Sequence, residues 1–501
     1  MIKAQNKFTN RGYVLTSLTF FGGVGEIGGN KILLEDEDTR LFLDFGMSFK
    51  QSGKFFSEFL QPRKCNCIED FRITSLLPDL KGVYRLDYLH HLGRPEEDCG
   101  VDAVLLSHAH ADHAAYIHHL RKDIPIYMSP ETHAILKTLE DTGSGSFSDL
   151  IHHRETFKLR PKKRGSGLTR LKGEEAKTRR PINIVESGRS FYIRSIEMKP
   201  YWVDHSLPGA TAFLIHTSQG TILYTGDFRF HGYKQEHTER MVEAASEEDI
   251  VACIIEGTHV VDTTGSTEVD VLRGAGADVA ETEGLSIVNF PPRDLARLQT
   301  FHTICKETDR RLALTFKHAY LLELMAELGD DYPSLDDPNI CFYAERKSWG
   351  LIGRDDYPPE IVAQDYDKWE REYLHRENTI NYHDIKENQG QFMFYCNYFQ
   401  LNELVDVAPE KGSRYVRSVC EPFSDEMLFD ERRVQNWLDL FGLGEPYQIH
   451  ASGHASGPQI INMIKRIEPE TIYPIHTESS AVFATEFKQT ISIEKGVQYT
   501  L

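Results

Sequence analysis

The residues of this chain with the clearest capacity for chemistry are three histidines and an aspartate within six positions. His108, His110, Asp112 and His113 follow an apolar run in "AVLLSHAHADHAA". Neutral imidazoles and carboxylates are good ligands for zinc-like ions. A loop between a strand and a helix can turn alternating side chains toward one point. Four potential ligands in six residues are enough to serve two metal ions, so the pattern predicts a metal site.

A second loop, "IHASGHASGP", combines small residues with hydrogen-bond donors. His450, Ser452, His454 and Ser456 can donate to phosphate oxygens, while glycine and alanine let the backbone approach a phosphate closely. The alternative interpretation is a Gly/Ser turn with incidental histidines. Beside a metal site, the loop is predicted to bind phosphate.

A third loop, "GGVGEIGGN" at residues 22–30, superficially resembles a dinucleotide-binding fingerprint. A strand-like run, "KILLE", follows it instead of a helix. The helix N-terminus that would hold a pyrophosphate is therefore missing, and we do not expect nucleotide binding there.

Alternating strands and helices are expected to position these loops. "YVLTSLTFF", "KILLE" and "RLFLDFG" read as strands, and "PIYMSPETHAILKTLEDT" reads as a strand followed by a helix. Strand and helix signals alternate from about residue 236 to 433, which favours an α/β lobe of its own. Residues 143–181 contain few periodic apolar positions and are expected to form an insertion or a long loop.

The charge of the chain limits its classes of partner. A net charge of -20 over 501 residues argues against a protein that coats nucleic acid through bulk electrostatics. Residues 158–181, "KLRPKKRGSGLTRLKGEEAKTRRP", are the exception, with ten Lys and Arg against two Glu. This basic insertion is either a solvated surface loop or a contact for a phosphate backbone.

The cysteines and the start of the chain help to predict the cellular compartment of the protein. Only Cys65 and Cys67 of the eight cysteines lie close together, without a partner pair at zinc-ribbon spacing, so we interpret the cysteines as reduced thiols. The sequence shows no signal peptide and no segment apolar enough to span a bilayer. A cytoplasmic protein without membrane contact is expected.

The pattern His-x-His-x-Asp-His behind an apolar strand resembles the signature of the metallo-β-lactamase fold. Four further positions match the other motifs of that family in the family's order: Asp44 in "RLFLDFG", His205 in "YWVDHSLPGA", Asp227 in "ILYTGDFRF" and His476 in "IYPIHTESS". The resemblance implies an α/β fold, the metallo-β-lactamase αββα sandwich.

The resemblance also implies how metal is held. One ion would be held by His108, His110 and His205, a second by Asp112, His113 and His476, and Asp227 would be shared. Asp44 would support the metal loop without binding metal. Two dications lower the pKa of a bridging water and clamp phosphate oxygens, which suits phosphodiester hydrolysis. Two zinc ions are expected, with manganese as the alternative because the ligands include two carboxylates.

A long α/β segment between Asp227 and His476 resembles the β-CASP subgroup of this family. Glu256 in "CIIEGTH" matches the subgroup's acidic motif and His454 matches its middle histidine. "IHASGHASG" followed by "IYPIH" is most similar to ribonuclease J. The implied domains are a metallo-β-lactamase domain at 1–235, with the basic insertion at about 143–181, a β-CASP domain at 236–433, and the rest of the first domain at 434–501.

The implied activity is a ribonuclease J-like phosphodiesterase that uses a two-metal-activated hydroxide on single-stranded RNA. Asp112, Glu256 and His454 are the candidate catalytic residues, with Glu256 orienting His454. Alternatives are a β-CASP nuclease acting on DNA, and a hydrolase of small phosphodiesters or esters. Ribonuclease J usually has His-Gly-His-Glu-Asp-His where this chain has "HAHADH", and the middle lobe reads "NFPPRD" where a Phe-Ala-Ser-Asn-like stretch is usual. Exonuclease or endonuclease mode and homo-oligomer formation stay open.

Overall fold

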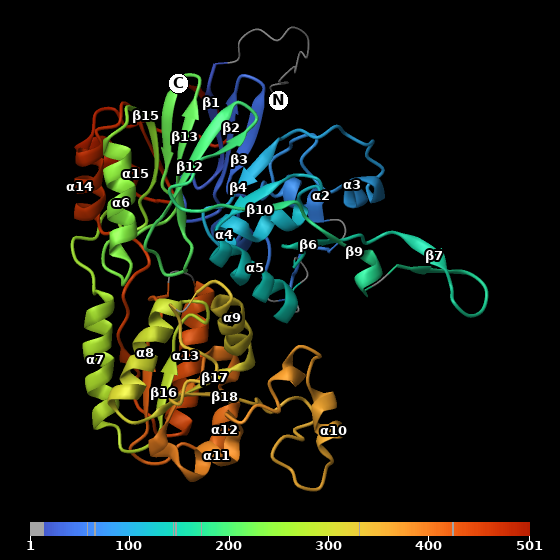
Figure 1. Cartoon of the computed structure of the whole chain (residues 1–501), viewed down its shortest axis with the longest axis vertical. Helices are drawn as coiled ribbons and strands as arrows, with labels where there is room; N and C mark the ends of the chain where they lie inside the picture. Colours follow the sequence, from blue (N-terminus) through green and yellow to red (C-terminus); the bar gives the residue numbers. More distant parts are fainter. Residues whose placement is uncertain are drawn as a thin grey trace.

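The computed structural model describes residues 15–501 except 58, 65–66, 144, 146–147, 172, 330 and 423–424, and of 425–426 it describes the backbone alone. Cys65 and Lys172 lie outside the described residues. Figure 1 shows two lobes stacked along the long axis, with a narrow arm projecting from the upper lobe. No helix in the described part of the chain is long and apolar enough to cross a membrane.

Two sheets form the centre of the upper lobe. The first has the order β10 (Ile182–Ile184), β5 (Ile126–Met128), β4 (Ala103–Leu105), β3 (Thr39–Leu43), β2 (Lys31–Asp36), β1 (Ser17–Gly22) and β24 (Gln498–Thr500). The second has the order β11 (Phe191–Ile193), β12 (Ile196–Trp202), β13 (Thr211–Thr217), β14 (Gly220–Tyr224), β15 (Ile250–Glu256) and β23 (Ile472–Ile475).

The period-2 alternation of strand side chains explains why these sheets stack. Leu41 and Leu43 of β3 pack into the core between the sheets, against residues such as Phe213 of β13, whereas Phe42 faces the outer helices. On the outer face of the second sheet, α6 (Gln235–Ser246) and α14 (Gly457–Ile467) bury Met241 and Ile460. The helices outside the first sheet include α2 (Cys67–Ile73), α3 (Leu86–His91), α4 (Ala111–Ala114) and α5 (Pro130–Thr142). The result is the predicted αββα sandwich.

The lower lobe is built on a third sheet with only parallel pairings. Its order is β19 (Thr379–Ile380), β18 (Ile340–Tyr343), β17 (Arg311–Thr315), β20 (Phe392–Tyr395), β16 (Ser286–Asn289), β21 (Arg414–Arg417) and β22 (Tyr447–Gln448). Helices cover both faces, as a parallel sheet requires. The lobe contains α7 (Glu268–Glu281), α8 (Leu295–Glu307), α9 (Phe316–Ala326), α10 (Pro359–Val362), α11 (Tyr382–Glu387), α12 (Glu403–Val407) and α13 (Asp425–Leu440). Two short helices, α1 (Phe49–Gly53) and α15 (Ser480–Glu486), belong to the upper lobe.

Three elements lie in a different lobe from the one expected with domain boundaries at 236 and 434. Helix α6 and strand β15 belong to the upper lobe, because β15 pairs with β14 and β23. Strand β22, in contrast, pairs with β21 of the third sheet. By sheet membership, the chain passes from the upper to the lower lobe after residue 256 and returns to the upper lobe after residue 448. Strand β15 is apolar up to Glu256, and an apolar run of this kind does not indicate which of the two sheets the strand joins.

The basic insertion is more regular than the long loop expected for residues 143–181. Strands β6 (His152–Arg154) and β9 (Lys177–Arg179) pair with each other, and β7 (Leu159–Pro161) pairs with β8 (Leu168–Arg170) in a hairpin. Strands of three residues are too short to show periodicity in a sequence. The hairpin is the arm that projects in Figure 1.

Candidate metal centre

A single buried carboxylate, Asp227, lies at the centre of the candidate site. It follows β14 by three residues and is 2% exposed. Its Oδ2 atom lies near one imidazole nitrogen of each of five histidines: 3.2 Å from His113, 3.6 Å from His108, 3.6 Å from His476, 3.9 Å from His454 and 4.0 Å from His205. The five histidines come from four separate segments of the chain, and Asp227 comes from a fifth. The structure therefore brings all seven predicted metal ligands and His454 to one place.

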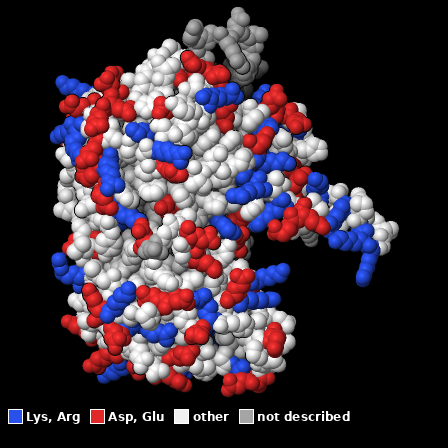
Figure 2. All heavy atoms as spheres, in the orientation of Figure 1, with Lys and Arg blue, Asp and Glu red and all other residues white. Residues whose placement is uncertain are grey.

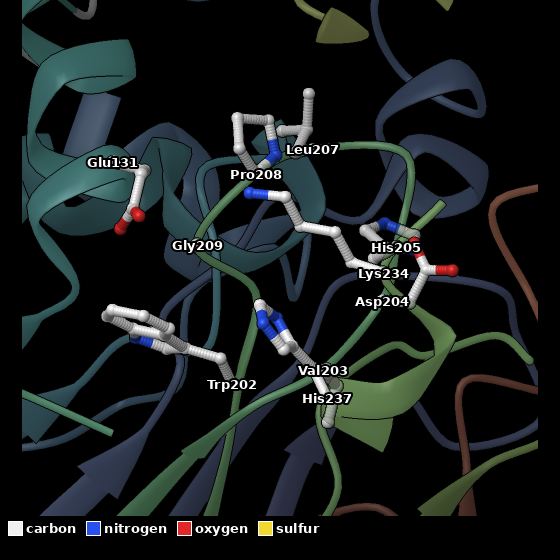
Figure 3. A pocket seen from close by; sticks show the side chains of 10 residues that line it. All are labelled: Glu131, Trp202, Val203, Asp204, His205, Leu207, Pro208, Gly209, Lys234 and His237. Carbon is white, nitrogen blue, oxygen red and sulfur yellow. The ribbon is translucent and has the colours of Figure 1, made fainter. Parts of the chain in front are cut away.

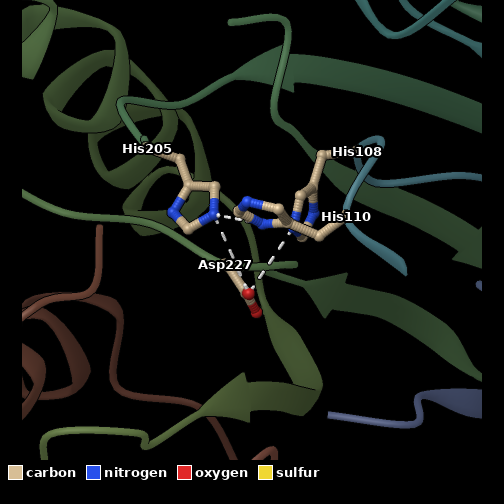
Figure 4. Close-up of side chains that lie close together, drawn as sticks. All are labelled: His108, His110, His205 and Asp227. Carbon is tan, nitrogen blue, oxygen red and sulfur yellow. Dashed lines mark hydrogen bonds and ion pairs between the residues drawn. The ribbon is translucent and has the colours of Figure 1, made fainter. Parts of the chain in front are cut away.

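His108, His110 and His205 form the first group with Asp227, as Figure 4 shows. His110 Nδ1 lies 2.9 Å from His108 Nε2 and 3.1 Å from His205 Nε2. His205 Nδ1 donates to the carbonyl oxygen of Gly453 at 2.5 Å, so in the neutral ring Nε2 carries a lone pair toward the group. Burial lowers the pKa of His110 to about 3 and that of His205 well below its usual range.

Asp112, His113 and His476 form the second group. His476 Nε2 lies 3.1 Å from Asp112 Oδ2, and His476 Nδ1 lies 2.8 Å from the hydroxyl of Thr258. His113 Nε2 is buried without a hydrogen-bond partner among the described residues. Asp227 belongs to the first group, and its Oδ2 also lies 3.2 Å from His113 and 3.6 Å from His476 of the second.

Asp44 contacts a candidate ligand through hydrogen bonds, in the supporting position that the family resemblance implied. Its Oδ2 lies 2.7 Å from His113 Nδ1, and it accepts hydrogen bonds from the backbone and the hydroxyl of Ser107 at 2.7 and 2.6 Å and from Tyr224. Asp44 is fully buried and belongs to neither candidate metal group. Its carboxylate fixes the tautomer of His113 with Nε2 free to ligate.

The glycine-rich loop at residues 22–30 packs directly on the second group. Gly28 has a φ of +78°, and a Cβ there would lie 2.4 Å from Asp112 Oδ2. The carbonyl oxygen of Gly23 accepts a hydrogen bond of 2.8 Å from the His476 backbone. The buried Lys31 ammonium donates to two carbonyl oxygens, those of Gly29 and another glycine. The glycines are thus needed for close approach to the candidate ligands, and nucleotide binding is not required to explain them.

Glu256 and His454 lie beside Asp227 as a pair. Strand β15 ends at Glu256, which is fully buried and lies 3.0 Å from His454 Nδ1 through Oε1. The ring of His454 also lies near those of His205 and His476, with centroids 5.1 and 5.5 Å away. Burial lowers the pKa of His454, but the charge and hydrogen bond of Glu256 outweigh it and raise that pKa to about 9.

Two family matches and several relatives agree with this geometry. Residues 94–240 match the metallo-beta-lactamase superfamily, and residues 445–499 match the Zn-dependent metallo-hydrolase RNA specificity domain. Ribonuclease J of Pyrococcus abyssi is 22% identical over 475 residues, which cover 91% of this chain and 88% of that protein. The chain carries a metallo-β-lactamase domain and is similar to ribonuclease J.

Other relatives of the RNase J-like protein match over different lengths. Ribonuclease J of Helicobacter pylori (strain ATCC 700392 / 26695) is 27% identical over 214 residues, 42% of this chain but only 23% of that protein. A crystal structure of a protein of unknown function from Enterococcus faecalis V583 superposes with a TM-score of 0.68 at 24% identity. That match covers 97% of this chain and 100% of the other, and it supports the fold.

The RNase J-like protein has a donor set that fits metal ions. Nδ1 of His205 and Nδ1 of His113 each lie against an oxygen partner, which leaves Nε2 of each ring to ligate. Asp227 Oδ1 and His113 Nε2 are both buried without hydrogen-bond partners in the described part of the chain. Unpaired buried polar atoms are costly, and a bound cation would satisfy them.

A buried ion network that holds the loop at residues 450–456 was not predicted from the sequence. Glu268 accepts from Arg229 at 2.9 Å and from Arg297 at 3.1 Å, and all three side chains are fully buried. Arg229 also donates to the carbonyl oxygen of Ser452 at 3.1 Å, and Arg297 donates to that of Ala451 at 3.2 Å. Residues from both lobes thus fix the loop that carries His454. Only pairwise distances reveal this network, because each residue alone looks like an ordinary charged helix or loop position.

The predicted phosphate-binding loop uses most of its polar groups internally. Arg297 lies 3.1 Å from His450 Nδ1, Ser452 accepts from the His454 backbone at 3.0 Å, and Ser456 begins α14 in a capping box with Gln459. A phosphate would therefore meet chiefly His454 and the loop backbone, and the roles of His450, Ser452 and Ser456 stay predictions.

A small pocket has His205 among its lining residues (Figure 3). It is lined by Glu131, Trp202, Val203, Asp204, His205, Leu207, Pro208, Gly209, Lys234 and His237. Burial raises the pKa of Glu131, and the Lys234 ammonium pairs with Asp331 at 3.0 Å. We assign no substrate to this pocket, because His205 is the one candidate metal ligand among its lining residues.

Proposed function

We propose that this RNase J-like protein hydrolyses phosphodiester bonds of single-stranded RNA with two metal ions, zinc or manganese. The observation that carries the proposal is the placement of Asp227 between two separate ligand groups, with His454 beside both. The match of residues 445–499 to an RNA specificity domain supports RNA as the polymer, because these residues include His454 and His476.

His108, His110 and His205 would hold one ion, Asp112, His113 and His476 the other, and Asp227 would bridge them. Bound ions would lower the pKa of water and neutralise phosphate oxygens. Asp112 is the most exposed carboxylate of the cluster, at 15% against 2% for Asp227. In the proposed mechanism Asp112 would hold an ion through Oδ2, while its other carboxylate oxygen orients the attacking water and accepts its proton.

His454 acts on the other end of the scissile bond in this proposal. Glu256 holds Nδ1, which leaves Nε2–H to donate to the leaving oxygen. The ring is 19% exposed whereas Glu256 is fully buried, so the imidazole is the member of the pair that a substrate can reach. Glu256 is the positioning residue of this pair.

Two other activities are alternatives for the same metal site. A DNA nuclease would use an identical metal site, since nothing in that site selects for a 2'-hydroxyl. A hydrolase of small phosphodiesters or esters is favoured by the net charge of -20, which repels polyanions. RNA is preferred because the match to the RNA specificity domain includes the loop that carries His454.

The deciding experiment compares single-stranded RNA, single-stranded DNA and bis-p-nitrophenyl phosphate, each with and without a chelator. We expect chelator-sensitive cleavage of RNA with much slower cleavage of DNA. Faster cleavage of DNA than of RNA would replace the proposal by the DNA nuclease. Cleavage of the small diester alone would replace it by the small-substrate hydrolase.

A further inference from the structure

The projecting arm of the upper lobe is strongly basic although the protein as a whole is acidic. Seven Lys and Arg and no Asp or Glu occur between residues 156 and 173, against a net charge of -20 for the chain. Figure 2 shows the arm reaching beyond the body of the molecule, with basic side chains toward its end and a hollow between it and the lower lobe. A local cation cluster of this kind attracts a polyanion that the remaining surface repels.

Most of the described cations of the arm are not used within the protein. Lys158 and Arg160, near the base, pair with Glu155 and Glu175. In the described part of the chain, no ion pair is formed by the remaining ones: Lys162, Lys163, Arg164 and Arg170. All four are exposed. Their charges are therefore available to phosphate groups.

The arm has a defined shape. Strands β7 and β8 pair over three positions, and the turn closes through a hydrogen bond of 3.0 Å from the Lys162 backbone to the carbonyl oxygen of Gly167. Gly165 and Gly167 have φ values of +76° and +99°. A Cβ added at Gly165 would meet no atom within 4 Å, and one at Gly167 would meet only the Lys162 ammonium, at 4.0 Å. A backbone so open at the turn lets a phosphate approach closely.

The base of the arm is anchored by buried charge. Arg85 is fully buried and pairs with Asp87 at 2.8 Å and with Asp149 at 2.9 Å. Glu140 is 3% exposed and accepts hydrogen bonds from three successive backbone N–H groups, at residues 150–152, of 2.7 to 2.9 Å. Because the base is fixed, the exposed cations are held away from the body at low entropic cost.

We propose that the arm binds the phosphate backbone of a long single-stranded RNA outside the metal centre, and so recruits polymer to an acidic enzyme. This inference rests on the proposed action on RNA. A second copy of the chain is the competing partner, since Leu159 and Leu168 of the arm are 58% and 60% exposed. Unpaired cations outnumber these two leucines and favour the polyanion.

The test compares the variant K162Q/K163Q/R164Q with the control K411Q/K465Q/K488Q, which removes three exposed lysines outside the arm. Affinity for a long RNA and for a trinucleotide is measured by fluorescence anisotropy with chelator present, so that no cleavage occurs. We expect the arm variant to bind long RNA about 10- to 100-fold more weakly, with a salt-dependence slope lower by about 2, as three lost phosphate contacts require. The control and the trinucleotide should be unaffected.

Equal losses in the arm variant and the control would overturn the inference, because bulk charge alone would then explain binding. Unchanged RNA affinity together with a changed sedimentation coefficient would overturn it in favour of a second copy. Cleavage of the trinucleotide by the wild-type protein, measured with metal restored, separates the two proposals. If cleavage occurs while the arm variant binds normally, the ribonuclease stands and the arm inference fails.

Discussion

Glu256 Oε1 lies 3.0 Å from His454 Nδ1, although the two residues are 198 positions apart. Glu256 ends a strand of the upper lobe, and His454 follows the chain's return from the lower lobe. The carboxylate is fully buried, and it also accepts from the backbone N–H groups of Phe228 and Thr258 at 3.1 Å. A carboxylate fixed in this way determines which nitrogen of His454 faces the substrate.

Replacing His454 by alanine is expected to slow RNA cleavage by about 10²- to 10⁴-fold, the usual contribution of a general acid. Metal content, measured by mass spectrometry, should not change. A p-nitrophenyl diester has a leaving group that needs no proton, so its hydrolysis should slow much less. Equal losses on RNA and on the p-nitrophenyl diester would reduce His454 to a binding residue.

Replacing His108 by alanine is expected to abolish hydrolysis by removing one metal ion. His108 Nε2 lies 2.9 Å from His110 Nδ1 and 3.6 Å from Asp227 Oδ2, so the substitution removes one ligand atom from the first group. Metal per chain and activity should fall together, while the circular dichroism spectrum changes little because the site lies on loops at strand ends. The matched control is His216→Ala on β13, whose ring pairs with Glu248 away from the site. Full activity in His108→Ala would contradict the proposed centre.

The sequence predicted the ligand cluster well because its chemistry is local. His108, His110, Asp112 and His113 are close in the chain, and the other candidate ligands stand at or just past strand ends, where periodic apolar runs stop. The αββα sandwich was predicted from the family resemblance, and the alternation within strands such as β3 explains how its two sheets pack.

The remaining features depend on partners that are distant in the sequence. The shared position of Glu268 between Arg229 and Arg297 requires knowing where α7 and α8 cross, which no local pattern specifies. The function of Gly28 depends on its contact with Asp112, 84 positions later. The hairpin arm was missed because β7 and β8 have three residues each.

Gly28→Ala is expected to weaken metal binding and activity by about 10- to 100-fold, as loss of a supporting contact around a metal site does. The new methyl group would overlap Asp112, whose Cβ lies 2.6 Å from the position it would occupy. Gly25→Ala is the matched control, since its φ is +62° but no atom lies within 4 Å of the added group. Both variants pay about 1 to 2 kcal/mol for the left-handed backbone. Equal metal affinity in the two variants would show that the close contact is unimportant.

Glu268→Gln should destabilise the fold by about 3 to 5 kcal/mol, because it leaves two buried guanidinium groups without their shared carboxylate. The free energy of unfolding in urea measures this loss. Glu281→Gln on the same helix is the control; its exposed pair with Arg414, 3.6 Å apart, is worth less than about 1 kcal/mol. If both variants lose the same stability, the buried network contributes no more than a surface pair.

The stability of the lower lobe should fall as pH rises through the range in which Glu403 ionises. This carboxyl group is 7% exposed and accepts hydrogen bonds from Tyr343 at 2.6 Å and from the Arg346 backbone at 3.2 Å. Burial outweighs these hydrogen bonds and raises its pKa from 4.5 to about 7. Below pH 4.5 the group is protonated in both the folded and the unfolded chain. Between pH 4.5 and 7 only the unfolded chain ionises, so the contribution of Glu403 to stability is progressively lost, by roughly 3 kcal/mol in all.

Glu403→Gln removes the ionisable group and keeps an acceptor for Tyr343. The difference in the free energy of unfolding between wild type and this variant should therefore change with pH across that window and level off above about pH 7. Glu327→Gln, at the exposed end of α9, should retain the wild-type pH dependence. Unfolding is followed in urea at fixed metal concentration, so that metal binding does not contribute to the comparison. A wild-type pH profile in Glu403→Gln would show that Glu403 ionises alike in the folded and unfolded chain, and burial would then not control this carboxyl group.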